Sequence, residues 1–303
     1  MIVRRSVLGL VAGAVALSAS GAMAQDWKAK YPEIVFGKIP DENASGTTDR
    51  YGPFMDFLSK EIGTKVTLRI AQDYAAVIEG QRAGQIQIGY YGPASYARAT
   101  MVGAKIEPVA IEVNEDGTKG YYSVFYVKKD SPYQKIEDLK GKNLGLVDPN
   151  STSGNNVPRF SLNKMGIDPE TFFSKVVYTG SHENAVIALG QGTVDVAANW
   201  WNDENESMLK RMERKGMAKY DDYRIIFKSE QIVNSPIAVM SDLPADLKKK
   251  IADAILAFPI KEPEAFKKMT DGKQRPWQPV THDAYKPVVE LNKFVDELRK
   301  KKS

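Results

Sequence analysis

The stretch Asp148-Pro149-Asn150-Ser151-Thr152-Ser153-Gly154 decides how this chain is interpreted. It follows an apolar run at residues 144–147, typical of a buried strand, and precedes a segment of helical character at 155–165 that stops at Gly166. Three hydroxyl side chains therefore stand where a strand leads into a helix N-terminus. Unpaired N–H groups, the positive end of the helix dipole and O–H donors meet there and suit a tetrahedral oxyanion. Plain N-capping is the alternative interpretation.

The N-terminus indicates export. The chain begins with the charged segment Met1-Ile2-Val3-Arg4-Arg5, continues with an apolar run over residues 7–19 and reaches Ala22-Met23-Ala24. This order predicts a secretory signal peptide over residues 1–24, cleaved after Ala24. The apolar run is too short for a membrane span. We therefore expect a soluble protein of the periplasm.

Composition argues against several classes of function. The chain has no cysteine, so no disulfide framework is expected. Loss of Arg4 and Arg5 with the signal peptide lowers Lys plus Arg from 42 to 40, against 38 acidic residues, and this small surplus indicates no nucleic-acid partner. The remaining residues, 25–303, can bury a core without covalent staples and are expected to form two lobes.

The first part of the mature chain alternates between strands and helices. Its patterns predict strands at residues 34–37, 65–70 and 86–90, separated by helices at 51–62 and 74–83. This β-α-β-α-β order is typical of a mostly parallel sheet covered by helices.

One motif occurs in both halves of the chain. Ala76-Val77-Ile78 precedes a glycine-containing turn and a strand that ends in Tyr90-Tyr91, and Ala185-Val186-Ile187 precedes a similar turn and a strand that ends in Trp200-Trp201. Any α/β protein repeats helix–glycine–strand segments, but the shared residues favour two α/β lobes of similar topology.

Two crossings are expected to connect the lobes. A β-rich run at residues 120–127 is predicted to lead into the second lobe, and residues 225–239 to lead back, so that the C-terminal helices pack on lobe 1. In such an arrangement the ligand lies in the cleft between the lobes. The predicted boundaries are residues 25–120 for the first part of lobe 1, 121–230 for lobe 2 and 231–303 for the rest of lobe 1.

His182 lies in a second turn of the same kind. Gly180-Ser181-His182-Glu183-Asn184 follows a predicted strand at residues 176–178 and opens a helix, as the Ser151–Ser153 turn does. Two such turns on neighbouring strands would direct their N–H groups at one crevice. The alternative is that Ser181 only caps the helix and His182 is exposed.

Aromatic residues form a second group of candidates. Six tyrosines fall at predicted strand ends or turns, and we expect two or three of them to touch the ligand, because their hydroxyls donate to an anion while their rings exclude water. They are Tyr74, Tyr90, Tyr91, Tyr96, Tyr121 and Tyr122. Asp203 lies in the segment Trp200-Trp201-Asn202-Asp203-Glu204, which could hold a cationic group of the ligand or could simply be an acidic helix start.

Enzyme motifs are absent from the sequence. There is no H-E-x-x-H, no G-x-S-x-G, no P-loop and no G-x-G-x-x-G after a strand. Two histidines and no cysteine leave only carboxylates for a metal cluster, so no metal and no cofactor is expected. A Ser151–His182–Asp195 triad can be drawn, but nothing supplies a nucleophile elbow. We expect no enzyme.

Four motifs resemble the periplasmic phosphonate-binding proteins of phosphonate and phosphite ABC importers. They are Gly-Pro-Ala-Ser-Tyr (92–96), Asp-Pro-Asn-Ser-Thr-Ser-Gly-x-x-Val-Pro-Arg (148–159), Gly-Ser-His-Glu-Asn-Ala (180–185) and Val-Asp-Val-Ala-Ala-Asn-Trp (194–200). The resemblance implies a type II periplasmic-binding fold, in which two α/β lobes are joined by a two-strand hinge. It also implies phosphoryl binding by Ser151, Thr152 and Ser153 with His182, Tyr74 and Tyr121. Where many members carry an aspartate before a proline, this chain has Ser235.

The expected function is capture of a phosphonate or phosphite in the interlobe cleft and delivery to a membrane permease. Alternatives are a binding protein for another oxyanion such as a phosphate ester or a sulfonate, one for a thiamine precursor, a ligand-sensing partner of a receptor kinase, and an exported hydrolase. The predicted ligand-binding residues are Tyr74, Tyr91, Tyr121, Ser151, Thr152, Ser153, His182, Asp203 and Ser235.

Overall fold

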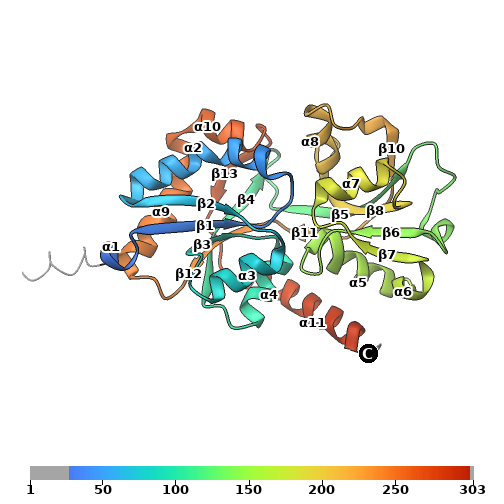
Figure 1. The fold of residues 1–303 in the computed structure, drawn as a ribbon, viewed down its shortest axis with the longest axis horizontal. Helices are drawn as coiled ribbons and strands as arrows, with labels where there is room; N and C mark the ends of the chain where they lie inside the picture. The colour runs from blue at the N-terminus through green and yellow to red at the C-terminus, as the bar shows by residue number, and fades with distance from the viewer. Residues whose placement is uncertain (1–26, 301–303) are drawn as a thin grey trace, which may run out of the picture.

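Two α/β lobes lie side by side in the protein (Figure 1). The computed structural model describes residues 27–300, so the predicted signal peptide and its cleavage site after Ala24 lie outside the described residues. Within residues 27–300, no helix combines the length and the apolar character needed to cross a membrane.

Lobe 1 is built on a six-stranded mixed sheet in the order β13-β4-β12-β3-β1-β2. Strand β1 runs parallel to β2 and β3, whereas β12 is antiparallel to both β3 and β4. The strands are β1 Glu33–Lys38, β2 Lys65–Ile70, β3 Ile88–Tyr90, β4 Ile106–Asn114, β12 Pro236–Met240 and β13 Gln274–Gln278. The helices of this lobe are α1 Trp27–Lys30, α2 Ala44–Ile62, α3 Tyr74–Arg82, α4 Pro93–Met101, α9 Ala245–Lys261 and α10 Pro263–Met269.

Lobe 2 is built on a second sheet, whose main order is β10-β5-β8-β6-β7. Its strands are β5 Gly120–Lys128, β6 Asn143–Leu146, β7 Lys175–Tyr178, β8 Val196–Asp203 and β10 Tyr223–Lys228, with the short β9 Glu206–Ser207 on β8 and β11 Ile232–Val233 on β5. Its helices and helical turns are η1 Ile136–Leu139, η2 Thr152–Asn156, α5 Val157–Lys164, α6 Pro169–Phe172, α7 His182–Gly190, α8 Met208–Arg214 and η3 Tyr220–Asp222.

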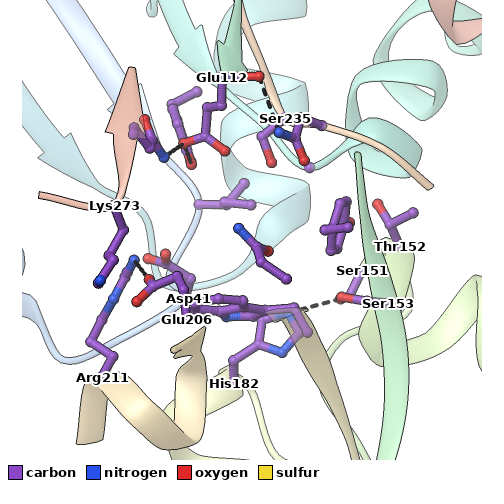
Figure 2. Close-up of a pocket in the computed structure, with 18 of the residues that line it drawn as sticks. Asp41, Glu112, Ser151, Thr152, Ser153, His182, Glu206, Arg211, Ser235 and Lys273 are labelled. Carbon is purple, nitrogen blue, oxygen red and sulfur yellow. Dashed lines mark hydrogen bonds and ion pairs between the residues drawn. The ribbon is translucent and has the colours of Figure 1, made fainter. Parts of the chain in front are cut away.

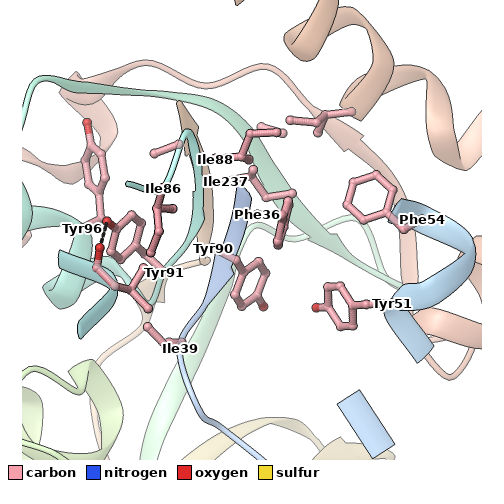
Figure 3. Close-up of a cluster of buried hydrophobic side chains, with 14 of the residues drawn as sticks. Phe36, Ile39, Tyr51, Phe54, Ile86, Ile88, Tyr90, Tyr91, Tyr96 and Ile237 are labelled. Carbon is pink, nitrogen blue, oxygen red and sulfur yellow. Dashed lines mark hydrogen bonds between the residues drawn. The ribbon is translucent and has the colours of Figure 1, made fainter. Parts of the chain in front are cut away.

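The core of lobe 1 explains how its first elements form, although helix α2 begins at Ala44 and not at the predicted residue 51. Every residue of β1 after Glu33 is buried, as expected for a parallel strand covered on both faces. Figure 3 shows Phe36 of β1 facing Phe54 of α2, and their ring centroids lie 5.7 Å apart. Helix α2 ends at Gly63, whose φ of +79° allows the left-handed C-cap.

The chain crosses between the lobes twice. Strand β4 of lobe 1 ends at Asn114 and β5 of lobe 2 begins at Gly120, while β11 still pairs with β5 before β12 enters the sheet of lobe 1. The crossings therefore lie at residues 115–119 and 234–235. Relative to the sequence-based boundaries, the first crossing comes slightly earlier and lobe 2 extends to Val233.

The C-terminal segment differs from expectation in two respects. A strand, β13, follows α10 and forms the edge of the lobe 1 sheet. The last helix, α11 Lys286–Lys300, follows the turn η4 His282–Tyr285 and packs on both lobes rather than on lobe 1 alone. Asn292 of α11 donates to the Ala94 carbonyl of lobe 1 and accepts from the Asn156 side chain of lobe 2.

Candidate functional site

A cavity of about 90 Å³ lies between the two lobes. Figure 2 shows the hydroxyl residues Ser151–Ser153 on one side of it, and Arg211 and Lys273 on the opposite side. Seven of the nine predicted ligand-binding residues line it: Tyr74, Tyr121, Ser151, Thr152, Ser153, His182 and Ser235. The sequence therefore placed seven of its nine candidates on the cavity wall, which other residues complete.

The hydroxyl turn has a closely packed local structure. Ser151 is an N-cap, and its Oγ accepts from the Gly154 N–H at 3.1 Å. A side chain at Gly154 would force the turn or the strand to shift, because an added Cβ would lie 2.4 Å from Cγ2 of Val147. The helix starts at Thr152 with the π-helical turn η2 and continues as α5, earlier than the predicted start at residue 155. Capping and the placement of hydroxyls at a cavity thus occur together in this turn.

Thr152 connects the lobes. Its Oγ1 accepts from the Ala94 N–H of α4 at 2.8 Å and so replaces the missing cap side chain of Gly92. Gly92 permits this approach, since an added Cβ would lie 3.2 Å from the Thr152 hydroxyl. The hydroxyl proton of Thr152 is not used in this bond and can be donated to a ligand in the cavity.

Two tyrosines of the cavity wall, Tyr74 and Tyr121, are uncharged donors. Tyr74, at the start of α3, is 1% exposed, and burial raises its pKa well above the ordinary value. Burial also raises the pKa of Tyr121 to about 12, although the hydroxyls of Thr152 and Ser153 act in the opposite direction. Both phenols therefore keep their protons at neutral pH and can donate hydrogen bonds to an anion.

His182 is buried rather than exposed. It opens α7, and its Nδ1 lies 2.9 Å from Oδ1 of Asn199 on β8. Its Nε2 lies 3.4 Å from the Ser151 Oγ (Figure 2). Burial lowers the pKa of His182 from 6.5 to about 4, so the imidazole is neutral at physiological pH. The two predicted turns therefore do meet at one crevice.

The side of the cavity opposite the turn is charged, and sequence reasoning missed its members. Although burial opposes ionisation of Asp41, Lys38 forms an ion pair with it and holds its pKa well below the ordinary value. Arg211 donates to Glu206 at 3.0 Å. The first pair lies at the end of β1 and in the loop after it, and the second lies on β9 and α8. No spacing pattern in the sequence links the two pairs.

Glu112 is the carboxylate of this wall that forms no ion pair within residues 27–300. Its Oε1 accepts from the Tyr90 hydroxyl at 2.7 Å and from Nε2 of Gln274 at 2.9 Å. Burial raises its pKa, and these hydrogen bonds act in the opposite direction. Figure 2 shows Glu112 beside Ser235 on the cavity wall.

Ion pairs also join the lobes beside the cavity. Lys215, which follows α8 in lobe 2, contacts Glu42 of lobe 1 at 2.7 Å. Arg214 of α8 contacts Asp271 of lobe 1 at 3.0 Å. Because these pairs bring the lobes together, the structure represents a closed arrangement of the cleft.

Two predicted residues, Tyr91 and Asp203, do not line the cavity. Tyr90, which precedes Tyr91, and Trp200, from the segment that contains Asp203, line the cavity instead. Because the side chains of successive strand residues point to opposite faces, Tyr91 points into the core of lobe 1. Its hydroxyl donates to Oε1 of Gln81 at 2.7 Å. Asp203 instead accepts from the backbone N–H of Glu206 at 3.0 Å and from that of Asn205, and closes a turn. The prediction for these two residues therefore has no support in the geometry.

The triad drawn on the sequence does not form. Asp195 accepts from the Asn143 N–H at 2.8 Å, and the partner of His182 is Asn199. Among residues 27–300, no group of three His, Cys, Asp or Glu side chains is arranged to hold a metal ion.

Comparison with known proteins identifies the family. The profile described as ABC transporter, phosphonate, periplasmic substrate-binding protein matches residues 36–285. The chain belongs to this family. Its members are substrate-binding proteins of transport systems, not enzymes.

Two curated relatives are similar in sequence. The phosphonates-binding periplasmic protein of Escherichia coli (strain K12) is 34% identical over 227 residues, which cover 74% of this chain and 65% of that protein. The match thus spans slightly less than two thirds of the length of the E. coli protein. The phosphate-import protein PhnD of Mycolicibacterium smegmatis (strain ATCC 700084 / mc(2)155) is 30% identical over 258 residues, with 80% and 79% coverage.

A solved structure confirms the fold. The crystal structure of a binding protein component of an ABC phosphonate transporter from Pseudomonas aeruginosa has a TM-score of 0.78 and 30% sequence identity. The similarity covers 87% of this chain and 86% of the other. The predicted type II periplasmic-binding fold, with two α/β lobes and a two-strand hinge, is therefore correct.

Proposed function

We propose that this protein is the solute-binding component of an ABC importer and captures a phosphonate or phosphite anion between its lobes. The observation that carries this proposal is the Ser151–Ser153 turn, which opens a helix inside the interlobe cavity beside Tyr74 and Tyr121. Hydroxyls and N–H groups at a helix N-terminus bind oxyanions without a full positive charge. Membership of the phosphonate-binding family supports the same ligand class.

Capture is expected to proceed by closure of the cleft. The anion binds first to the turns of lobe 2, and lobe 1 then adds Tyr74 and the N-terminus of α4, which Thr152 caps across the cleft. A ligand that contacts both lobes binds the closed state more tightly and therefore shifts the protein towards it. The predicted signal peptide directs the protein to the periplasm. There the closed protein delivers its ligand to a permease in the membrane.

A thermal-shift screen tests this proposal. Methylphosphonate, aminoethylphosphonate and phosphite are compared with phosphate and methanesulfonate. A ligand present at 100 times its Kd should raise the free energy of unfolding by about 2.7 kcal/mol. Stabilisation by at least one phosphonate or by phosphite supports the proposal. Stabilisation by methanesulfonate alone would contradict it.

Phosphate is a second candidate ligand. The M. smegmatis relative is named a phosphate-import protein, and it matches this chain over most of both lengths. A phosphoryl group is common to both candidates, so the Ser151–Ser153 turn does not distinguish them. The same screen does: tighter binding of phosphate than of any phosphonate or phosphite would assign phosphate import.

A further inference from the structure

One group of the cavity wall, Nε2 of His182, is a hydrogen-bond acceptor, although an anion site is expected to offer only donors. Nδ2 of Asn199 donates to the His182 carbonyl at 2.9 Å, and the Trp200 N–H donates to Oδ1 of Asn199 at 2.9 Å. These two bonds fix the orientation of the amide, so its oxygen faces Nδ1 of His182 at 2.9 Å. Nδ1 must therefore carry the ring proton, and the neutral ring presents a lone pair at Nε2.

The lone pair of Nε2 is available to a ligand. Nε2 lies 3.4 Å from the Ser151 Oγ, which is long for a hydrogen bond that involves a hydroxyl. That Oγ already accepts from the Gly154 N–H, so its own proton can turn towards the ligand. His182 is only 5% exposed, so an anion oxygen without a proton placed against Nε2 would meet a lone pair with no water to separate them.

Within residues 27–300, the charged side chains around His182 provide no unpaired cation for a doubly charged anion. Lys38 pairs with Asp41, Arg211 with Glu206 and Lys273 with Glu115. On the side of helices α7 and α8, Glu183 pairs with Lys215. Tyr74 stays neutral. This balance favours a ligand with a single negative charge.

We propose that the site binds its ligand as the monoprotonated anion, whose P–OH group donates to Nε2 of His182, and that this bond rejects sulfonates. The inference rests on the proposed function and adds the protonation state of the ligand. A sulfonate has the same shape and the same single charge but no proton to donate. A buried site built to pair with a ligand hydroxyl disfavours an analogue without it by a factor on the order of 10⁴. Asn199 acts as a positioning residue, because it sets the tautomer of His182.

Calorimetry over a range of pH tests the protonation state. Above the second pKa of methylphosphonate, the affinity of the wild-type protein should fall about tenfold for each pH unit, because the monoanion becomes scarcer. Binding that stays constant or strengthens over this range would overturn the inference but leave the proposed function intact. Failure of phosphonates, phosphite and phosphate to bind at any pH would instead overturn the proposed function.

Nitrogen NMR of the complex shows where the proton lies. With ¹⁵N-labelled histidine, Nε2 of His182 should keep the chemical shift of an unprotonated ring nitrogen when methylphosphonate is bound. The chain has two histidines, so a His282→Gln variant assigns the signals. A protonated Nε2 in the complex would mean that the dianion binds to an imidazolium, and the inference would be wrong.

A substitution tests the role in discrimination. In His182→Gln the side-chain amide can turn its NH₂ group to the ligand, so the ratio of methanesulfonate Kd to methylphosphonate Kd should fall at least about tenfold. His282→Gln is the matched control, because His282 contacts Tyr96 in lobe 1 and does not line the cavity. An unchanged ratio in folded His182→Gln would overturn the inference. If that variant does not fold, the pH and NMR measurements on the wild-type protein decide.

Discussion

At the scale of single residues, the site depends on neutral side chains held in fixed orientations. Thr152, Tyr74 and Tyr121 offer protons, and His182 offers a lone pair whose direction Asn199 sets. Each of these groups is buried, so it loses water in the folded protein and regains a partner from the protein or from the ligand. Their arrangement has a stability cost that can be measured.

The pH dependence of stability should reveal buried His182. Its pKa lies at about 4 in the folded protein against 6.5 in an unfolded chain, so the unfolded chain binds more protons between these values. The free energy of unfolding should therefore fall by about 3 kcal/mol through this group as pH drops from 6.5 to 4. Urea unfolding of the wild-type protein and His182→Gln measures the difference. Parallel curves for the two proteins would contradict the prediction, and His282→Gln should follow the wild type.

The sequence predicts donors better than it predicts the charged wall. Hydroxyls at a strand-to-helix turn have a local signature, and the repeat of that signature at Ser181-His182 led to the second turn. Glu112 has no such signature, because it lies near the end of β4 and meets Gln274 from another part of the chain. Tyr91 and Asp203 were misplaced because the strand register, which decides the face, is not visible in a short aromatic or acidic cluster.

At the scale of elements, the turn between β6 and α5 sets the geometry of the site. Gly154 lies against Val147, and the Val147 N–H donates to the Gly154 carbonyl at 2.9 Å. The glycine therefore allows the helix N-terminus to lie directly over the end of the strand. Strands β1 and β2 and helix α3 were predicted nearly to the residue because their patterns are regular. Edge strand β13 was missed because it contains Pro276 and polar residues.

Gly154→Ala should disturb this element. Its Cβ would lie 2.4 Å from Cγ2 of Val147, so the turn or the strand must shift, which costs about 1–3 kcal/mol of stability. Displacement of the turn should also weaken anion binding. Gly52→Ala is the control, because nothing lies within 4 Å of its added Cβ inside helix α2. Chemical denaturation gives the stability of both variants, and equal stability of the two would refute this role of Gly154.

At the scale of the whole molecule, two covalent crossings, helix α11 and the interlobe ion pairs hold the lobes together. Asp271 of lobe 1 contacts both Arg214 and Arg211 of lobe 2, at 3.0 Å and 3.6 Å. The sequence indicated the two lobes through the duplicated motif and their crossings through the β-rich runs at residues 120–127 and 225–239. It did not indicate that α11 spans both lobes, because an amphipathic pattern shows that a helix has a buried face but not which elements cover it.

Asp271→Asn should favour the open cleft. Asparagine tolerates the positive φ of 53° at this position, so the substitution removes the charge without straining the backbone. The radius of gyration of the ligand-free protein in small-angle X-ray scattering should increase, and ligand affinity should fall several-fold, since partly exposed ion pairs contribute modestly. Asp253→Asn, which loses an exposed pair with Lys249 inside α9, should change neither quantity. A scattering profile identical to that of the wild type would exclude a role in closure.

The most direct test of the central claim is titration calorimetry with methylphosphonate on the wild-type protein, Thr152→Ala and the control Thr48→Ala. The Thr48 hydroxyl donates to the Ala44 carbonyl of its own helix and lies on exposed helix surface. We predict one site per wild-type chain, unchanged binding in Thr48→Ala, and at least about tenfold weaker binding in Thr152→Ala, because a donor is lost and the buried Ala94 N–H is left unpaired. Equal affinity of Thr152→Ala and the wild type would contradict phosphoryl recognition by this turn.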